Sequence, residues 1–269
     1  MDEPYYLYAL TWADVPPQPP QAGVDPRFPV EIWPAGRVAG IVSRVGLDQF
    51  RIDKLQADTT DVAWLGEVAM RHNGIVAALA RRGTVLPLKL GTLFQSRSSL
   101  ADKLAKCEAE VAAFLRRLAD RQEWAVKVYF DDTRAEEVLV PDDSSDRDLL
   151  KNHRGMATSA GAGAQYLAAR QRQTARRRNV QVAVKQELLA LDQRLQPLVD
   201  DWRALPVLPG TLTGRREKMV WNGAFLVAGG GQSLFHAACD DLRHHLGGKG
   251  LLLEVTGPWP LYHFCPMLD

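Results

Sequence analysis

Cysteine, long apolar runs and net charge are all scarce in this sequence. The three cysteines, Cys107, Cys239 and Cys265, are too few and too scattered for a disulfide framework, which favours a reducing compartment. No apolar run approaches the ~20 residues that span a bilayer. The first residues, Met1 to Pro4, carry acids where a secretory signal carries bases. We therefore expect a cytoplasmic protein that neither crosses a membrane nor is exported.

Charge is nearly balanced over the whole chain but not along it. The 33 Lys and Arg residues offset 32 Asp and Glu residues, and the formal net charge of +1 produces no overall field toward nucleic acid or anionic lipid. Residues 131–148, however, contain eight acids and two bases, a net of −6, whereas residues 149–186 contain eight bases and no acid, a net of +8. Any electrostatic docking must therefore be local.

The length of 269 residues corresponds to about two domains of ~100–200 residues each. In the first half, strand-like apolar segments alternate with segments whose apolar residues recur at helical spacing. We expect strands at 5–10, 30–33, 37–43, 84–91 and 124–130, a helix over 60–82 capped by Thr60 or Asp61, and a second helix starting near Ser98 or Ser99. This alternation predicts an α+β domain over residues 1–135, with Pro87 placing its strand at an edge or a bulge.

A charged linker over residues 136–160 is expected to lead into a second domain over residues 161–269. Its long helix has an apolar seam with steps of three and four residues, formed by Val180, Val184, Leu188, Leu191, Leu195, Leu198 and Trp202. Pro197 predicts a kink or a break near Gln196. A strand, a helix and a strand over 219–227, 233–246 and 251–255 form a βαβ unit, and a last strand is expected at 261–264.

The usual signatures of catalysis and nucleotide binding are missing. Residues 161–166 begin like a dinucleotide fingerprint, but Tyr166 stands where the third glycine is required and no strand precedes it. Residues 247–250 lack the upstream glycine of a phosphate-binding loop, and no Ser or Thr follows Lys249. Neither G-x-S-x-G nor H-E-x-x-H occurs. We predict no catalytic residue and no cofactor.

One metal hypothesis remains open. His236 and Cys239 lie three residues apart on an expected helix, and His263 and Cys265 lie two apart on an expected strand, so the four could form a closed zinc site. The spacing matches no familiar zinc knuckle, and Cys239 can equally be a small core residue. His72 shares a helical face with apolar residues, which favours a hydrogen-bonded core histidine over an acid–base catalyst.

The basic block over residues 151–185 has two interpretations. Arg176, Arg177 and Arg178 could neutralise phosphates in a nucleic-acid-binding regulatory protein. Only Tyr166 supplies a stacking ring, however, and no recognition motif is present. The other interpretation is a solvated helix face or an electrostatic dock for an acidic protein.

Several short stretches, spread over nearly the whole chain, carry a recognisable pattern. They are Tyr-Tyr-Leu-Tyr-Ala at 5–9, Thr-Val-Leu-Pro-Leu-Lys-Leu-Gly-Thr-Leu-Phe at 84–94, Gly-x-x-Tyr-Leu at 163–167, Asn-Gly-Ala-Phe-Leu-Val at 222–227 and Gly-Pro-Trp-Pro-Leu-Tyr-His-Phe at 257–264. In this order they resemble the gas vesicle protein F/L family (GvpF/GvpL). The last stretch is the most specific, because it is similar to the family's closing Gly-Pro-Trp-Pro-Pro-Tyr-x-Phe. Leu90 and Leu261 depart from the family pattern, but both remain apolar.

The resemblance implies a non-enzymatic accessory or minor structural protein of gas vesicles, the gas-filled shells that give cells buoyancy. Its implied partners are the major shell protein, which is small and hydrophobic, and other gas vesicle accessory proteins. The implied fold is two α+β domains, the C-terminal one a modified ferredoxin-like unit with a βαβ motif beside the long helical segment. We expect neither nucleic acid nor a membrane as a partner.

Two aromatic residues are candidates for partner binding. Trp259 and Tyr262 lie in a proline-stiffened stretch that could present them to an apolar partner, while the charged blocks, including Arg176, Arg177 and Arg178, fix its orientation. Both aromatic side chains could instead fill the core of the second domain, because aromatic residues dominate cores as well as interfaces. The sequence leaves these two roles open.

Overall fold

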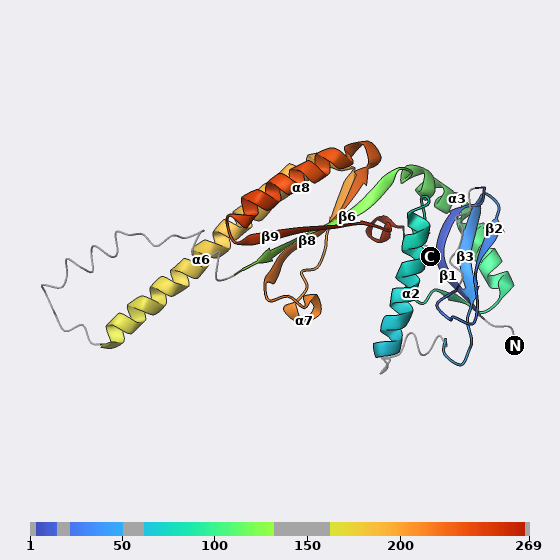
Figure 1. The fold of residues 1–269 in the computed structure, drawn as a ribbon, viewed down its shortest axis with the longest axis horizontal. Helices are drawn as coiled ribbons and strands as arrows, with labels where there is room; N and C mark the ends of the chain where they lie inside the picture. The colour runs from blue at the N-terminus through green and yellow to red at the C-terminus, as the bar shows by residue number, and fades with distance from the viewer. Residues whose placement is uncertain (1–3, 15–21, 51–61, 132–161, 267–269) are drawn as a thin grey trace, which may run out of the picture. The chain divides into compact units, whose positions relative to one another are not determined.

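The computed structural model describes residues 4–14, 22–50, 62–131 and 162–266 (Figure 1). The contacts divide the chain into two compact units, one formed by residues 1–123 together with 257–269, the other by residues 124–256. The chain therefore leaves the first unit and returns to it. Among the described residues, no helix is both long enough and apolar enough to cross a membrane.

The first unit is built on an antiparallel sheet around a buried central strand. Its order is β2 (Val30–Ala35), β3 (Val38–Arg44), β1 (Tyr5–Trp12) and β4 (Leu86–Pro87), and β5 (Leu93–Phe94) also pairs with β1. Tyr6 to Leu10 are buried, as expected for a strand that is apolar on both faces. Pro87 lies in the two-residue edge strand, where its missing N–H breaks no ladder.

Helices α2 (Val62–Ala80) and α3 (Arg97–Arg117) pack on this sheet. Ser96 caps α3, because its hydroxyl accepts a hydrogen bond from the Ser99 backbone N–H while the Ser99 hydroxyl lies within reach of the Ser96 backbone N–H. The helix thus begins one or two residues before the expected start. The expected caps of the other helix, Thr60 and Asp61, lie outside the described residues.

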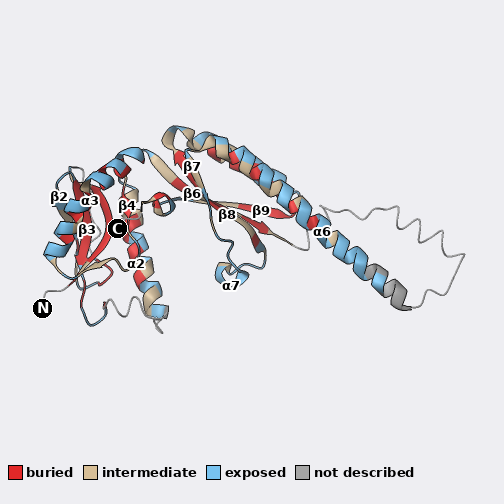
Figure 2. Cartoon of the chain, turned by 180° about the vertical axis from the view of Figure 1, so that it is seen from behind, coloured by how far each residue is buried: buried red, intermediate tan, exposed pale blue. Residues whose placement is uncertain are grey.

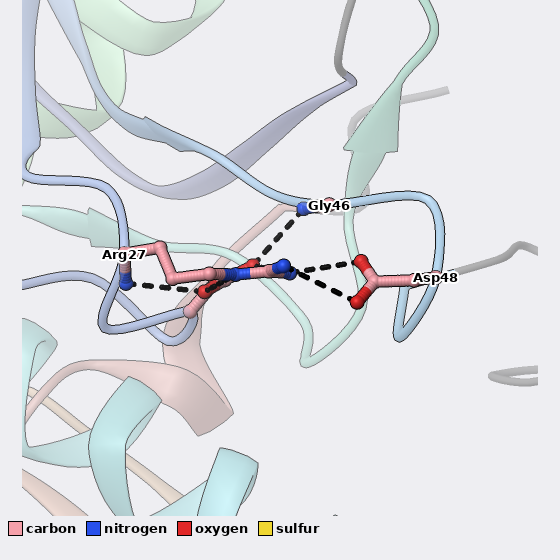
Figure 3. A network of polar contacts seen from close by, with 4 residues as sticks. Arg27, Gly46 and Asp48 are labelled. Carbon is pink, nitrogen blue, oxygen red and sulfur yellow. Dashed lines mark hydrogen bonds and ion pairs between the residues drawn. The ribbon is translucent and has the colours of Figure 1, made fainter.

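A polar network fixes the connections beside the sheet (Figure 3). The buried Asp25 carboxylate accepts hydrogen bonds from the Arg27 backbone N–H, Nε and Nη2 and from the Gly46 backbone N–H at 3.1, 2.9, 2.7 and 3.0 Å. Burial alone would raise the pKa of Asp25, but the hydrogen bonds from Arg27 and Gly46 outweigh it and hold this pKa below its usual value. Arg27 also reaches the exposed Asp48 carboxylate at 2.8 Å.

The second unit has the connectivity β-α-β-β-α-β of a ferredoxin-like fold. Its elements in chain order are β6 (Arg121–Phe130), α6 (Ala162–Leu195), β7 (Asp201–Ala204), β8 (Lys218–Ala228), α8 (Gln232–Gly247) and β9 (Leu251–Trp259). The strand order is β7-β8-β6-β9, so the first strand of the set is central. Figures 1 and 2 show α6 and α8 side by side over one face of the sheet, where their buried residues join those of β6 and β8 in one core.

The position of β6 differs from the expected domain division. The sequence assigns residues 124–130 to the first domain and ends that domain at 135, whereas the structure pairs β6 with β8 and β9 in the second sheet. The alternating pattern of Val126 and Val128 predicts a strand, but it does not specify which sheet the strand joins. A ferredoxin-like unit needs this strand at its centre, and so the fold begins well before residue 161.

Helix α6 spans 34 residues, or about 50 Å at ~1.5 Å per residue. Its buried positions start at Val180 and end at Leu195, and Figure 2 shows the preceding turns exposed where they are described. The break expected near Gln196 is confirmed, because Pro197 lies in a 3-10 turn (η2, Gln196–Leu198). The seam therefore ends there, and Trp202 belongs to β7. The expected linker, 136–160, lies outside the described residues.

The prediction of a last strand at 261–264 is wrong. Strand β9 continues to Trp259, and Tyr262–Phe264 form a 3-10 turn (η4) in which the Tyr262 backbone N–H donates to the Pro260 carbonyl at 2.7 Å. Pro258 and Pro260 have no N–H for a ladder, and the chain turns after them. Residues 257–266 belong to the first unit, so the closing stretch is remote in sequence from most of what it packs against.

Candidate partner-binding site

The closing stretch lines a cleft of about 630 Å³ in the first unit. The other lining residues come from the end of α2 and the chain after it, 77 and 80–85, and from the start of β6 with the residue before it, 120–122. Trp259 is 49% exposed at this cleft, although large aromatic side chains are usually mostly buried. The cleft therefore presents an aromatic surface to solvent.

The cleft has an apolar floor and a positively charged rim. Val85, Pro260 and Leu261 are buried and line it, whereas Arg81 and Arg82 are exposed. Arg121 and Asp120 also line the cleft, which gives three bases against one acid, a net of +2. Such a surface can pack apolar groups and pair with carboxylates.

Tyr262 has a different role from Trp259. It packs against the core of the first unit, and its hydroxyl donates a hydrogen bond to Asn73 Oδ1 at 3.0 Å. Burial raises the pKa of Tyr262, so the phenol stays protonated at neutral pH. Of the two aromatic residues singled out from the sequence, Tyr262 anchors the closing stretch and Trp259 is the exposed one.

A second contact holds the closing stretch from the other side. Glu123, 2% exposed, accepts hydrogen bonds from the His263 backbone N–H at 3.1 Å and from His263 Nδ1 at 2.6 Å. The Glu123 carboxylate raises the pKa of His263, although the partial burial of the imidazole opposes this shift. The stretch that carries Trp259 is therefore held by both Tyr262 and His263.

The three candidate arginines lie on α6 in the second unit. Arg177 and Arg178 are exposed, and Arg176 is half-buried. They precede Val180, the first buried position of the helix. Within α6 up to residue 186, all charged side chains are basic. This basic face and the Trp259 cleft are separate features on separate units.

The residues of the metal hypothesis are distributed over both units. Cys239 is buried in the core of the second unit, and His236 lies edge-on against Trp124 at 4.3 Å between ring centroids. His263 is paired with Glu123 in the first unit, and the Cys265 thiol donates to the Leu261 carbonyl at 2.8 Å. The described part of the chain contains no group of three or more His, Cys, Asp or Glu side chains placed to hold a metal ion.

His72 lies in the core of the first unit. It is 2% exposed, and its Nδ1 is 2.9 Å from the Tyr6 hydroxyl. Burial lowers the pKa of His72 to about 4, so the imidazole is neutral at pH 7. It does not line the Trp259 cleft.

Sequence reasoning missed a second exposed apolar feature, the connection between β7 and β8. Val207, Leu208 and Leu212 are 51%, 38% and 72% exposed there. The backbone is internally bonded, since the Leu205 N–H donates to Asn222 O and the Leu212 N–H to Pro209 O, each at 2.9 Å. The sequence does indicate this feature, because residues 204–214 form a run of eleven positions without a charged side chain.

Comparisons with known proteins agree along nearly the full length. The model of the family "Gas vesicle synthesis protein GvpL/GvpF" matches residues 4–266. Gas vesicle protein F of Streptomyces sp. (strain CB03234) is 28% identical over 96% of this chain and 98% of its own. Gas vesicle protein L of the same strain is 25% identical over 100% of this chain and 95% of its own.

Solved structures show the same fold. Gas vesicle protein GvpF from Anabaena sp. PCC7120 has a TM-score of 0.67 at 17% identity, covering 99% of both chains. GvpF from Microcystis aeruginosa has a TM-score of 0.63 at 12% identity, covering 99% of this chain and 100% of its own. Because the family model spans nearly the whole sequence, the chain belongs to the GvpL/GvpF family of gas vesicle synthesis proteins.

Proposed function

We propose that this protein is an accessory or minor structural protein of gas vesicles, located in the cytoplasm and at the vesicle, that binds the small hydrophobic shell protein and supports vesicle assembly. Buoyancy is the resulting property of the cell. Membership of the GvpL/GvpF family supports the setting. The protein acts by contact with other gas vesicle proteins and transforms no substrate.

The observation that carries this proposal is the exposure of Trp259. Half of this side chain is accessible, while its neighbours Pro260 and Leu261 are buried and Tyr262 is bonded to Asn73. An exposed aromatic residue on an anchored backbone loses little conformational entropy on binding, and such residues are common at the energetic centre of interfaces. An apolar shell subunit offers the complementary surface.

The basic face of α6 has an orienting role in this proposal. Exposed arginines such as Arg177 and Arg178 attract an acidic surface of another accessory protein, which speeds and orients association more than it tightens it. The alternative function, nucleic-acid binding through the same face, predicts steeply salt-dependent retention on a nucleic-acid column. Retention of this protein on the nucleic-acid column at physiological ionic strength, together with no co-purification of the shell protein, would favour that alternative.

The test is deletion of the gene in a vesicle-forming cell that keeps the shell gene, followed by complementation. The wild-type gene should restore flotation and co-purification of the shell protein in moderate salt. Trp259→Ala should weaken that association by about 2 kcal/mol, or roughly thirtyfold. Met70→Ala, which removes a 70% exposed apolar side chain from α2 in the same unit, is the matched control and should behave as wild type. Undiminished flotation after deletion would refute the proposal.

A further inference from the structure

We propose that the Trp259 cleft binds an extended segment of the shell protein in which a carboxylate side chain lies next to a large apolar side chain. The inference rests on the proposed function for the identity of the partner. The recognition chemistry comes from the cleft itself. Its apolar floor, the Trp259 side chain that forms an aromatic wall, and its basic rim each select one property of the segment.

The apolar part of the segment is selected by the floor and the wall. Val85 and Leu261 are 2% and 5% exposed and line the cleft, and Trp259 stands beside them with half of its surface accessible. A Leu, Ile, Val or Phe side chain placed there removes apolar surface of both partners from water. Tyr262 and His263 fix the backbone on the far side of Leu261, so the wall is already in position before binding.

The acidic part is selected by the rim, and Arg81 is its most informative residue. Arg81 follows the last residue of α2 and is exposed. Its guanidinium makes no hydrogen bond or ion pair to another residue in the part of the chain that the structure describes. With Arg82 and Arg121 against Asp120, the rim is positive. A carboxylate beside the apolar side chain therefore meets a complementary charge.

A polypeptide segment fits this cleft better than a small metabolite does. The volume of about 630 Å³ lies in the range of small-molecule sites, but such sites orient their ligand with a few enclosed polar groups. Here the buried lining residues Val85, Pro260 and Leu261 are apolar, and the charged ones stand at the exposed or half-exposed rim. This arrangement, with an apolar centre and a polar rim, is typical of protein interfaces.

The experiment uses the full-length protein and synthetic peptides that span the shell protein of the same cell, with binding measured by fluorescence anisotropy. The peptides that bind should contain Asp or Glu next to a large apolar residue. Replacement of that acid by Lys should weaken binding to wild type at least about tenfold. The Arg81→Glu variant should bind the original acidic peptide more weakly by a similar factor and should regain affinity for the Lys peptide. The Trp259→Ala substitution should lower the affinity for both peptides.

The matched control is Arg116→Glu, because Arg116 is also an exposed arginine near the C-terminal end of a helix in the first unit but lies outside the cleft. It should bind as wild type does. Equal affinity of Arg81→Glu and wild type for every peptide would overturn the inference, as would the absence of any binding peptide. Loss of vesicles on gene deletion together with either result would leave the proposed function standing. Suppose instead that flotation is undiminished after gene deletion but Arg81→Glu exchanges the preference between the acidic and the Lys peptide. The proposed function would then be refuted, and the proposed recognition chemistry of the cleft would stand.

Discussion

The buried carboxylate of Glu123 is bonded to both the backbone nitrogen and the imidazole Nδ1 of His263, 140 residues later in the chain. One side chain thereby fixes the position and the ring orientation of a residue that follows Trp259 by four positions. A hydrogen bond to a charged group stabilises a fold more than one between neutral groups does. We therefore expect the contact between Glu123 and His263 to contribute more to the free energy of unfolding than an ordinary side-chain hydrogen bond.

Glu123→Gln tests that contact. The amide keeps the shape of the side chain but removes the charge that raises the pKa of His263. We expect this pKa to fall toward its ordinary value in an NMR titration and the free energy of unfolding to drop by about 1.5–3 kcal/mol. Glu110→Gln, on the exposed face of α3, is the control and should change neither quantity. An unchanged His263 titration in Glu123→Gln would contradict the assignment.

The stability of the first unit should fall in mild acid because of His72. Its pKa is about 4 in the folded protein against ~6.5 in the unfolded chain, so the unfolded state takes up the proton first as the pH falls. The stabilisation is complete above pH ~6.5 and is lost progressively as the pH falls to about 4, and the total loss in the free energy of unfolding is roughly 3 kcal/mol.

Urea unfolding at pH 7, 5.5 and 4.5 measures this loss, and His72→Gln should show a shallower decline than wild type. His244→Gln, which changes an exposed histidine of α8, should decline as wild type does. His263 titrates with the opposite sign, because its raised pKa stabilises the fold at low pH and this contribution disappears as the pH rises through that pKa. Parallel curves for wild type and His72→Gln would show that His72 is not the cause.

The two carboxylates that share Arg27 should differ in their effect on stability (Figure 3). Asp25→Ala leaves the Gly46 N–H without its acceptor in a buried site, and we expect a loss of about 3 kcal/mol in the free energy of unfolding. Asp48→Ala removes an exposed pair, with the Asp48 side chain 59% accessible, and should cost less than about 1 kcal/mol. Thermal or urea unfolding of both variants checks the difference, and equal losses would contradict it.

Most secondary structure could be predicted from the sequence, because it follows from local periodicity. The helices α2, α3, α6 and α8 and the break at Pro197 lie close to their expected positions. The assignment of β6 to a sheet could not be predicted in this way, since Val126 and Val128 alternate identically in either sheet. Partner choice between strands is decided by tertiary packing, which the local pattern does not contain.

The candidate site was predictable only in part. The stretch at 257–264 identified Trp259 and Tyr262 together, but their separation into an exposed residue and an anchor depends on Asn73, 189 positions before Tyr262. Arg81 gave no signal, because an arginine after a helix is ordinary in any sequence. Its significance arises from the neighbouring cleft, which forms only when the closing stretch packs beside α2.

The excursion of the chain out of the first unit after Glu123 and its return at Gly257 impose an order on synthesis. The ribosome delivers every residue of the second unit before it delivers the closing stretch, so the second unit can fold while the first still lacks His263 and Tyr262. The wall that contains Trp259 is therefore put in place only after the second unit has been synthesised. A nascent chain cannot display this cleft before residues 257–261 have left the ribosome, which happens only after the whole second unit has been made.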